Sequence, residues 1–285
     1  MRAALGEALA RNNGERGRTV ASKIFAVLDT FGDTQESLRL TDIAQRSRLP
    51  MPTAHRMVGE LVKWGGLERS RDGSYRIGRH MWAIGNVSPC MRRLRELGQP
   101  HLQALAATTH ANAQLAVLDG TEALFLDRVH GRGTPLIHTR MGGRLPLHAT
   151  AVGKVLLAHA PAALRREVLE RRLIRFTPYT VQSPGRLLRE LDDVRTRGVA
   201  ASREELQQGV VSVAVPISHP DQGVIAAIGA VTASAVQEAR LIHAVRTAAA
   251  AMERAVAAEA QRQEWERGDS APTVARSGFP LPPPT

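Results

Sequence analysis

Cysteine is almost absent from this chain, since Cys90 is the only one among 285 residues. A single thiol excludes an intrachain disulfide and a metal site built from several thiolates. Long apolar runs are also missing, and none approaches the roughly 20 residues that a membrane-spanning helix needs. The opening stretch, MRAALGEALARNNGERG, lacks the apolar core of a signal peptide. These absences predict a cytoplasmic protein that has no membrane partner.

The signatures of common enzymes are missing as well. Gly153 and Lys154 resemble the end of a phosphate-binding loop, but His148 replaces its first glycine and Val155 replaces its Ser or Thr. No G-x-S-x-G sequence is present to expose a serine nucleophile, and the ten histidines show no H-E-x-x-H spacing. We therefore expect no catalytic residue, no metal site and no cofactor.

Acidic residues are too few to balance the basic ones, because 38 Lys and Arg stand against 27 Asp and Glu, a net charge of +11. Most of the bases are arginines, which suit bidentate contacts to phosphate and guanine. Residues 39–80 hold nine bases and four acids, and nine minus four gives +5, whereas residues 1–38 carry five of each sign. An excess confined to one segment is typical of a protein that binds a polyanion. The alternative is an ordinary solvated face.

Residues 40–78 show the order of elements of a winged helix-turn-helix. We expect a short helix opened by Thr41, a tight turn, a second helix from near Pro52, and a hairpin that turns at Asp72 and Gly73. The second helix is sized for a DNA major groove. Its apolar face should pack on the preceding helices, and consists of Ala54, Met57, Val58, Leu61 and Val62.

The opposite face of that helix and the hairpin provide the candidate DNA contacts. Thr53 lies in the first turn, where a hydroxyl and backbone N–H groups can hold a phosphate. Arg56 is the candidate for a guanine contact and His55 for a base edge or a phosphate. The full predicted set is Thr41, Pro52, Thr53, His55, Arg56, Glu60, Lys63, Arg69, Arg71 and Arg76.

Two of these interpretations have structural alternatives. Arg56 could form an ion pair with Glu60, its neighbour at i+4, which is worth only a few tenths of a kcal/mol. Tyr75, on the hairpin, is expected to pack on the first helix and not on DNA. A helix-turn-helix can also bind protein, but duplex DNA is the partner that we expect.

The rest of the chain alternates helices and strands. Residues 79–108 read as mostly helical, with interruptions at Ser88-Pro89 and at residues 98–100. Strands are predicted over 113–119, 122–131, 134–141, 199–204, 210–218 and 223–233, and helices over 150–159, 161–173, 184–197 and 234–263. Antiparallel strands flanked by helices predict an α+β domain with one sheet.

These patterns divide the chain into five parts. They are a flexible arm (1–18), a winged helix-turn-helix (19–78), a linker helix (79–99), an α+β domain (100–263), and a disordered tail (264–285).

Six stretches match a known family in the same order: LTDIAQRSRLPMPTAHRMVGEL, SYRIG, LGQPHLQALAATTHANAQLAVLDG, GGRLPLHATAVGKVLLA, FTPYT and REELQQGVVSVAVPI. Through them the chain resembles the isocitrate-lyase-regulator (IclR) family of bacterial transcription factors over about residues 20–260. The resemblance implies a winged helix-turn-helix joined by a linker helix to a GAF/PAS-like effector domain. It also implies homodimers, often paired into tetramers, on (pseudo)palindromic operators, with a small-molecule effector and either repression or activation.

The resemblance places the effector cavity between the sheet and the helix start at residues 148–154. The small residues Ala151, Val152 and Gly153 should leave N–H groups free for a carboxylate. Arg144 and His148 could neutralise an anion, with surface or core roles as the alternative.

Family positions that contact small polar acids align with Ser202, Ser212, Gly229 and Val231. Only the two serines keep a hydrogen-bonding side chain, so we expect a larger or more apolar organic acid, such as an aromatic one. Ser212 could instead be a small core-facing residue of its strand. A non-specific architectural DNA-binding protein and an enzyme that uses the cavity are the remaining alternatives; a large sensing domain argues against the first.

Overall fold

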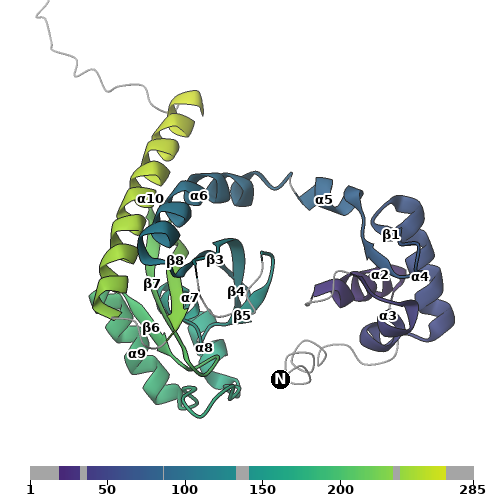
Figure 1. Ribbon diagram of the computed structural model, residues 1–285, viewed down its shortest axis with the longest axis horizontal. Helices are drawn as coiled ribbons and strands as arrows, with labels where there is room; N and C mark the ends of the chain where they lie inside the picture. The colour runs from purple at the N-terminus through teal and green to yellow at the C-terminus, as the bar shows by residue number, and fades with distance from the viewer. Residues whose placement is uncertain (1–18, 33–36, 86, 133–140, 234–237, 268–285) are drawn as a thin grey trace, which may run out of the picture.

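The computed structural model describes residues 19–32, 37–85, 87–132, 141–233 and 238–267. Figure 1 shows an amino-terminal head in purple and blue, a carboxyl-terminal domain in teal, green and yellow, and two helices that join them. The predicted arm (1–18), the tail beyond residue 267 and most of the predicted strand 134–141 lie outside the described ranges.

The head is the winged helix-turn-helix that the sequence predicts. It consists of α2 (Val20–Leu28), the 3-10 helix η1 (Asp29–Gly32), α3 (Leu40–Ser47), α4 (Met51–Trp64), β1 (Leu67–Arg69) and β2 (Tyr75–Ile77). Helix α3 begins at Leu40, one residue before the predicted Thr41, because Asp42 Oδ2 accepts the Arg39 N–H (3.3 Å). Helix α4 ends where Gly65 takes a φ of 80°, a conformation that glycine adopts without strain.

One apolar cluster holds the head together. The predicted face of α4 contributes Ala54, Met57, Val58 and Leu61, all buried against Ile43 and Ala44 of α3, with Ile24 and Leu28 of α2 packed alongside. Tyr75 of the hairpin belongs to the same cluster and is only 6% exposed. The packing role predicted for Tyr75 is therefore confirmed.

Helices α5 (Arg79–Gly85) and α6 (Pro89–Thr109) connect the head to the second domain (Figure 1). The predicted interruption at Ser88-Pro89 falls where α5 and α6 separate. The second predicted interruption was wrong, because α6 continues through Pro100. Gly98 allows α6 to pack closely on the sheet at this point, because a Cβ on it would lie 2.8 Å from Leu115 Cδ2.

The second domain is built on one antiparallel sheet of six strands. One antiparallel sheet was predicted, but its edge strand at residues 144–146 was not. Its strands are β3 (Asn112–Asp119), β4 (Glu122–Val129), β5 (Arg144–Pro146), β6 (Ala200–Arg203), β7 (Val210–His219) and β8 (Gly223–Ala233), in the spatial order β5-β4-β3-β8-β7-β6. The first and last strands of this sheet along the chain therefore lie side by side at its centre, where β3 pairs with β8.

Helices cover both faces of this sheet. One face packs on α6 and on α10 (Glu238–Arg267), which runs along the domain in yellow in Figure 1. The other face packs on α7 (Ala151–His159), against which α8 (Ala162–Glu170) and α9 (Pro184–Arg197) lie in turn. Several boundaries differ from prediction by a few residues. The largest differences are that α8 ends at Glu170 instead of residue 173, and that α10 includes residues 264–267 of the predicted tail.

Candidate DNA interface and effector site

Helix α4 presents its polar face to solvent. Of the ten predicted DNA-binding residues, nine have exposed side chains and Thr53 is half-buried. The ion pair with Glu60 that was the structural alternative for Arg56 does not form, because Glu60 Oε1 binds Lys63 Nζ at 3.0 Å. None of the described residues bonds to Arg56, so its guanidinium is available for a base edge.

The start of α4 has the properties of a phosphate site. Pro50 precedes the helix and provides no side-chain cap, so the N–H groups of Met51 and Thr53 have no partner in the described part of the chain. Uncapped N–H groups at a helix N-terminus attract anions through hydrogen bonding and the helix dipole. The Thr53 hydroxyl adds a third donor at the same helix start, and its phosphate contact stays a prediction.

The three arginines of the hairpin differ in their contacts. Arg69 lies over the Tyr75 ring, 5.8 Å from its centroid, and Arg76 binds Glu68 Oε2 at 2.9 Å. Arg71, next to the tip of the hairpin, bonds to none of the described residues. It is therefore the hairpin cation that can reach a DNA backbone without breaking an internal contact.

In the second domain the predicted effector residues share one face of the sheet. Ser202 stands opposite Ser212, Ser212 stands opposite Val231, and Gly229 stands opposite Gln114. This face packs on α7, since a Cβ on Gly229 would lie 3.2 Å from Val152 Cγ1. Strands far apart in sequence thus bring the predicted residues beside the α7 N-terminus.

The first turn of α7 holds two unpaired donors and one capped donor. Thr150 Oγ1 accepts the Gly153 N–H at 3.1 Å, so the expectation that this amide is free was wrong. The N–H groups of Ala151 and Val152 have no partner among the described residues, although both residues are fully buried. The first N–H groups of any α-helix lack an intrahelical partner, so these two donors remain available to an acceptor.

The two predicted serines differ in whether their hydroxyl groups already have a hydrogen-bond partner. Ser202 donates its hydroxyl to the Ala149 carbonyl oxygen at 2.9 Å, which ties β6 to the residue before the α7 cap. The Ser212 hydroxyl has no hydrogen-bond partner within the described ranges, although the residue is buried. Ser212 is therefore the serine that can still bind an effector through its hydroxyl.

Arg144 and His148 do not supply charge to this face. The Arg144 side chain binds Asp119, with Nε 2.8 Å from Oδ2. Burial lowers the pKa of His148, and the Ile174 carbonyl oxygen, 3.0 Å from its Nε2, opposes only part of that shift. A neutral imidazole cannot neutralise an anion, so the structure favours the core role for His148.

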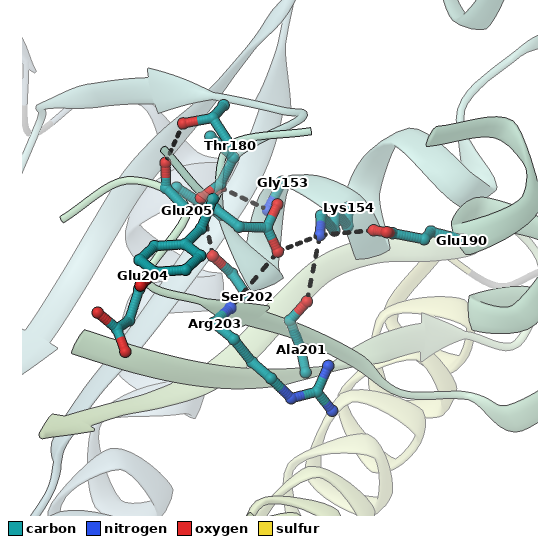
Figure 2. Close-up of polar contacts among 12 residues, drawn as sticks. Gly153, Lys154, Thr180, Glu190, Ala201, Ser202, Arg203, Glu204 and Glu205 are labelled. Atoms are coloured by element: carbon teal, nitrogen blue, oxygen red, sulfur yellow. Dashed lines mark hydrogen bonds and ion pairs between the residues drawn. The ribbon is translucent and has the colours of Figure 1, made fainter. Parts of the chain in front are cut away.

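A buried ion cluster lies directly behind the first turn of α7. Lys154 is 2% exposed, and its Nζ donates to Glu205 Oε1 (2.6 Å), Glu190 Oε2 (2.8 Å) and the Ala201 carbonyl oxygen (3.3 Å). Figure 2 shows the lysine between the two carboxylates. The cluster joins α7 to α9 and to the segment after β6, and so positions the donors at the start of α7.

The two carboxylates titrate in opposite directions. Burial raises the pKa of Glu205, and the charge of Lys154 offsets only part of this effect. Burial acts the same way on Glu190, but Lys154 and then Arg186 outweigh it and lower the pKa of Glu190. Over the described ranges, no three His, Cys, Asp or Glu side chains are placed to hold a metal ion, and no helix has the length and apolar character for crossing a bilayer.

Known proteins share both parts of the chain. Residues 20–71 match the family described as the IclR helix-turn-helix domain, and residues 91–255 match the bacterial transcriptional regulator IclR C-terminal family. The chain belongs to the IclR family. This IclR-family protein is therefore a DNA-binding transcriptional regulator whose second domain is the family's effector-binding domain.

Individual relatives agree with the family assignment. The regulator XynR of Escherichia coli is 33% identical over 218 residues, which cover 75% of this chain and 86% of XynR. BhcR of Paracoccus denitrificans is 35% identical over 193 residues, 67% of this chain and 69% of BhcR. An IclR homolog of Microbacterium hydrocarbonoxydans, solved in complex with 4-hydroxybenzoate, is 34% identical with a TM-score of 0.79, covering 84% of this chain and 99% of that one.

Sequence reasoning on this IclR-family regulator missed two features of the second domain. Lys154 was read as part of a failed phosphate loop, whereas it is the centre of the buried ion cluster. Gln114 was not singled out within the predicted strand 113–119, whereas it lies on the face toward α7 with a buried oxygen that none of the described residues pairs. The signal for Gln114 was present, because it is the one polar residue between Ala113 and Leu118.

Proposed function

We propose that this IclR-family regulator holds a (pseudo)palindromic operator with two winged heads, and that a small organic acid bound in the second domain controls this binding. One observation carries this proposal. Helix α4 is exposed and lacks a side-chain cap, its Arg56 has no partner in the described part of the chain, and the second domain holds buried donors that are likewise unpaired there. The first arrangement suits duplex DNA and the second suits a buried small anion. We propose a cytoplasmic regulator without catalytic activity.

The effector that we propose is a carboxylic acid with a sizeable apolar part. The N–H groups of Ala151 and Val152 would bind its carboxylate, and the Ser212 hydroxyl would add a hydrogen bond. Around them the sheet contributes small or apolar residues, among them Gly229 and Val231, which suits an aromatic or aliphatic body. The 4-hydroxybenzoate complex of the Microbacterium homolog supports an aromatic acid. Gly153 and Ser202 would shape this site through their internal hydrogen bonds.

We propose a second copy of the chain as the partner of helix α5. Trp82, Ile84, Val87 and Met91 are exposed apolar residues on α5, on the joint that follows it, and on the start of α6. Large apolar side chains gathered in one segment mark interaction surfaces. This segment adjoins the head, and two heads must be held about 34 Å apart to enter successive major grooves. A dimer formed there would carry a change in the second domain to the spacing of the heads.

Selection from a random duplex library by the full-length protein tests the DNA-binding part. We expect a two-fold-related consensus that binds more tightly than a scrambled duplex at about 0.15 M salt. Arg56→Ala should lower this preference by about 1–3 kcal/mol, roughly 5- to 150-fold, because it removes a base contact. Mobility shifts on the consensus and scrambled duplexes measure both quantities.

Arg189→Ala is the matched control, since Arg189 is an exposed arginine of α9 in the other domain and carries the same charge. It should leave the preference unchanged. A wild-type protein that binds consensus and scrambled duplexes equally would refute sequence-specific regulation and favour an architectural role.

A further inference from the structure

Gln114 carries a buried amide that has no hydrogen-bond partner among the described residues. Its side chain is 4% exposed, and Oε1 is shut off from solvent without a hydrogen bond. The amide nitrogen also bonds to nothing in the described part of the protein. Buried polar side chains nearly always have partners, so an unpaired amide calls for a specific explanation.

The surroundings of Gln114 explain why none of the described residues pairs with its amide. In the sheet register Gln114 lies opposite Gly229 of β8, which has no side chain, and beyond Gly229 lies Ala214 of β7. The next row along the same face holds Val231 and Ser212. Gln114 is thus a polar residue set among small and apolar ones, on the face that packs on the start of α7.

Two independent observations therefore converge on one place. The N–H groups of Ala151 and Val152 lack acceptors, and the Gln114 amide lacks both a donor for its oxygen and an acceptor for its nitrogen within the described ranges. Val152 packs on Gly229, the direct cross-strand neighbour of Gln114, which puts the two sets of groups next to each other. One small molecule can satisfy both sets.

We infer that Gln114 is the residue that selects a hydroxylated acid over the plain acid. A carbonyl oxygen can only accept a hydrogen bond, so Gln114 Oε1 requires a ligand with an O–H or N–H donor. The α7 N–H groups bind the carboxylate at one end of the effector, and Gln114 binds a hydroxyl on its body. The inference rests on the proposed effector site and adds the chemistry that this site recognises.

A site with a buried amide should favour the hydroxylated acid over the plain acid for a physical reason. A hydroxylated acid pairs the amide, whereas the plain acid leaves it buried and unpaired in the complex. Sites built around a hydrogen-bonding group discriminate against ligands that lack the matching group. Replacing Gln114 by leucine removes the unpaired amide and therefore removes the preference.

Calorimetric titration of the full-length protein with benzoate, 3-hydroxybenzoate and 4-hydroxybenzoate tests this inference. We expect the wild type to bind at least one hydroxybenzoate about tenfold or more tightly than benzoate, the worth of one good hydrogen bond. Gln114→Leu should bind that hydroxybenzoate no more tightly than benzoate, while its affinity for benzoate stays the same or rises. Gln103→Leu, an exposed glutamine of α6, is the matched control and should keep the wild-type ratio.

The melting temperature of the ligand-free protein gives a second readout. An unpaired buried amide destabilises the fold, so Gln114→Leu should melt at or above the wild-type temperature. A clear drop would mean that Gln114 has a structural partner, and would overturn the inference. An unchanged ratio of hydroxybenzoate to benzoate affinity in Gln114→Leu would overturn this inference and leave the proposed effector class standing. If no probe bound the wild type, the proposed effector class and this inference would both fall.

Discussion

At the scale of single residues, Lys154 is the clearest case of a side chain whose role depends on burial. Its ammonium group is removed from water and held by two carboxylates and one carbonyl oxygen. Breaking a buried ion pair from one side leaves an uncompensated charge, which is far more damaging than loss of an exposed pair. On the head, Lys63 forms an exposed ion pair with Glu60 that water already screens, so loss of this lysine should matter much less.

Lys154→Met should therefore lower the free energy of unfolding by about 3–5 kcal/mol. Adding Glu205→Gln should recover part of that loss, because a neutral amide replaces the orphaned buried carboxylate. Lys63→Met, the exposed counterpart, should change stability by no more than about 1 kcal/mol. Urea unfolding of the three proteins measures this; equal effects of the two lysine substitutions would show that the cluster is not a buried pair.

The burial of His148 leads to a prediction about how the free energy of unfolding changes at acidic pH. Its pKa is lowered in the folded protein mainly by burial, so the unfolded chain takes up the proton more readily. The contribution of His148 is fully present above the ordinary histidine pKa of about 6.5 and is lost as the pH falls through its lowered folded value.

His148→Gln should make stability less dependent on pH below about 6.5, since glutamine can still donate to the Ile174 carbonyl but does not titrate. His55→Gln, at an exposed position of α4, is the control and should keep the wild-type slope. The measurement is the urea midpoint across a pH series. A slope in His148→Gln as steep as in the wild type would assign the acid response to other groups.

At the scale of elements, internal contacts decide which of the three arginines of hairpin β1-β2 is available for DNA. Arg76 binds Glu68 and Arg69 lies on the Tyr75 ring, whereas Arg71 has no bond to any of the described residues. Arg71→Ala should reduce the slope of log K against log salt by about 1 and weaken all duplexes alike, because it removes one phosphate contact. Mobility shifts over a salt series test this, with Arg189→Ala as the charge-matched control. An unchanged slope would place the hairpin away from the DNA backbone.

Helix α6 shows where element prediction failed and why. Gly98 and Pro100 are helix breakers by local propensity, and they predicted an interruption. The helix continues because Leu102 and Leu105 bury themselves in the sheet core, and because Gly98 lets α6 approach Leu115. Tertiary packing outweighed local propensity over one turn. The residues that lie against Gly98, Leu115 and Met252, are too distant in sequence for the pattern around Gly98 to reveal them.

At the scale of the whole molecule, the exposed segment from α5 to the start of α6 sets a prediction about assembly. Trp82 is 71% exposed and Ile84 is 48% exposed. The double change Trp82→Glu with Ile84→Glu should weaken the dimer and lower affinity for a full operator by about a hundredfold or more, because the second head is no longer linked. Affinity for a half-site should change little.

Leu188→Glu provides the control, since Leu188 is an exposed apolar residue of α9 (43%) away from the head. Sedimentation equilibrium measures assembly and mobility shifts measure affinity. A dimer that survives the double change would place the interface elsewhere on the chain.

The sequence by itself determined the head, five of the six described strands of the sheet and the family. These features depend on local patterns: a capped helix start, a glycine helix end, an apolar stripe of helical spacing, and alternation in strands. Each pattern is set by interactions within a few residues, so the order of amino acids is enough to predict it.

Only the tertiary structure decided what the second domain presents to a ligand. Strand register placed Gln114, Ser212 and Gly229 on one face beside the start of α7. The packing of α9 and of the segment after β6 placed two carboxylates around Lys154. Whether a polar side chain finds a partner depends on neighbours that non-local pairing brings together. That pairing gave Ser202 a partner and left Gln114 without one among the described residues.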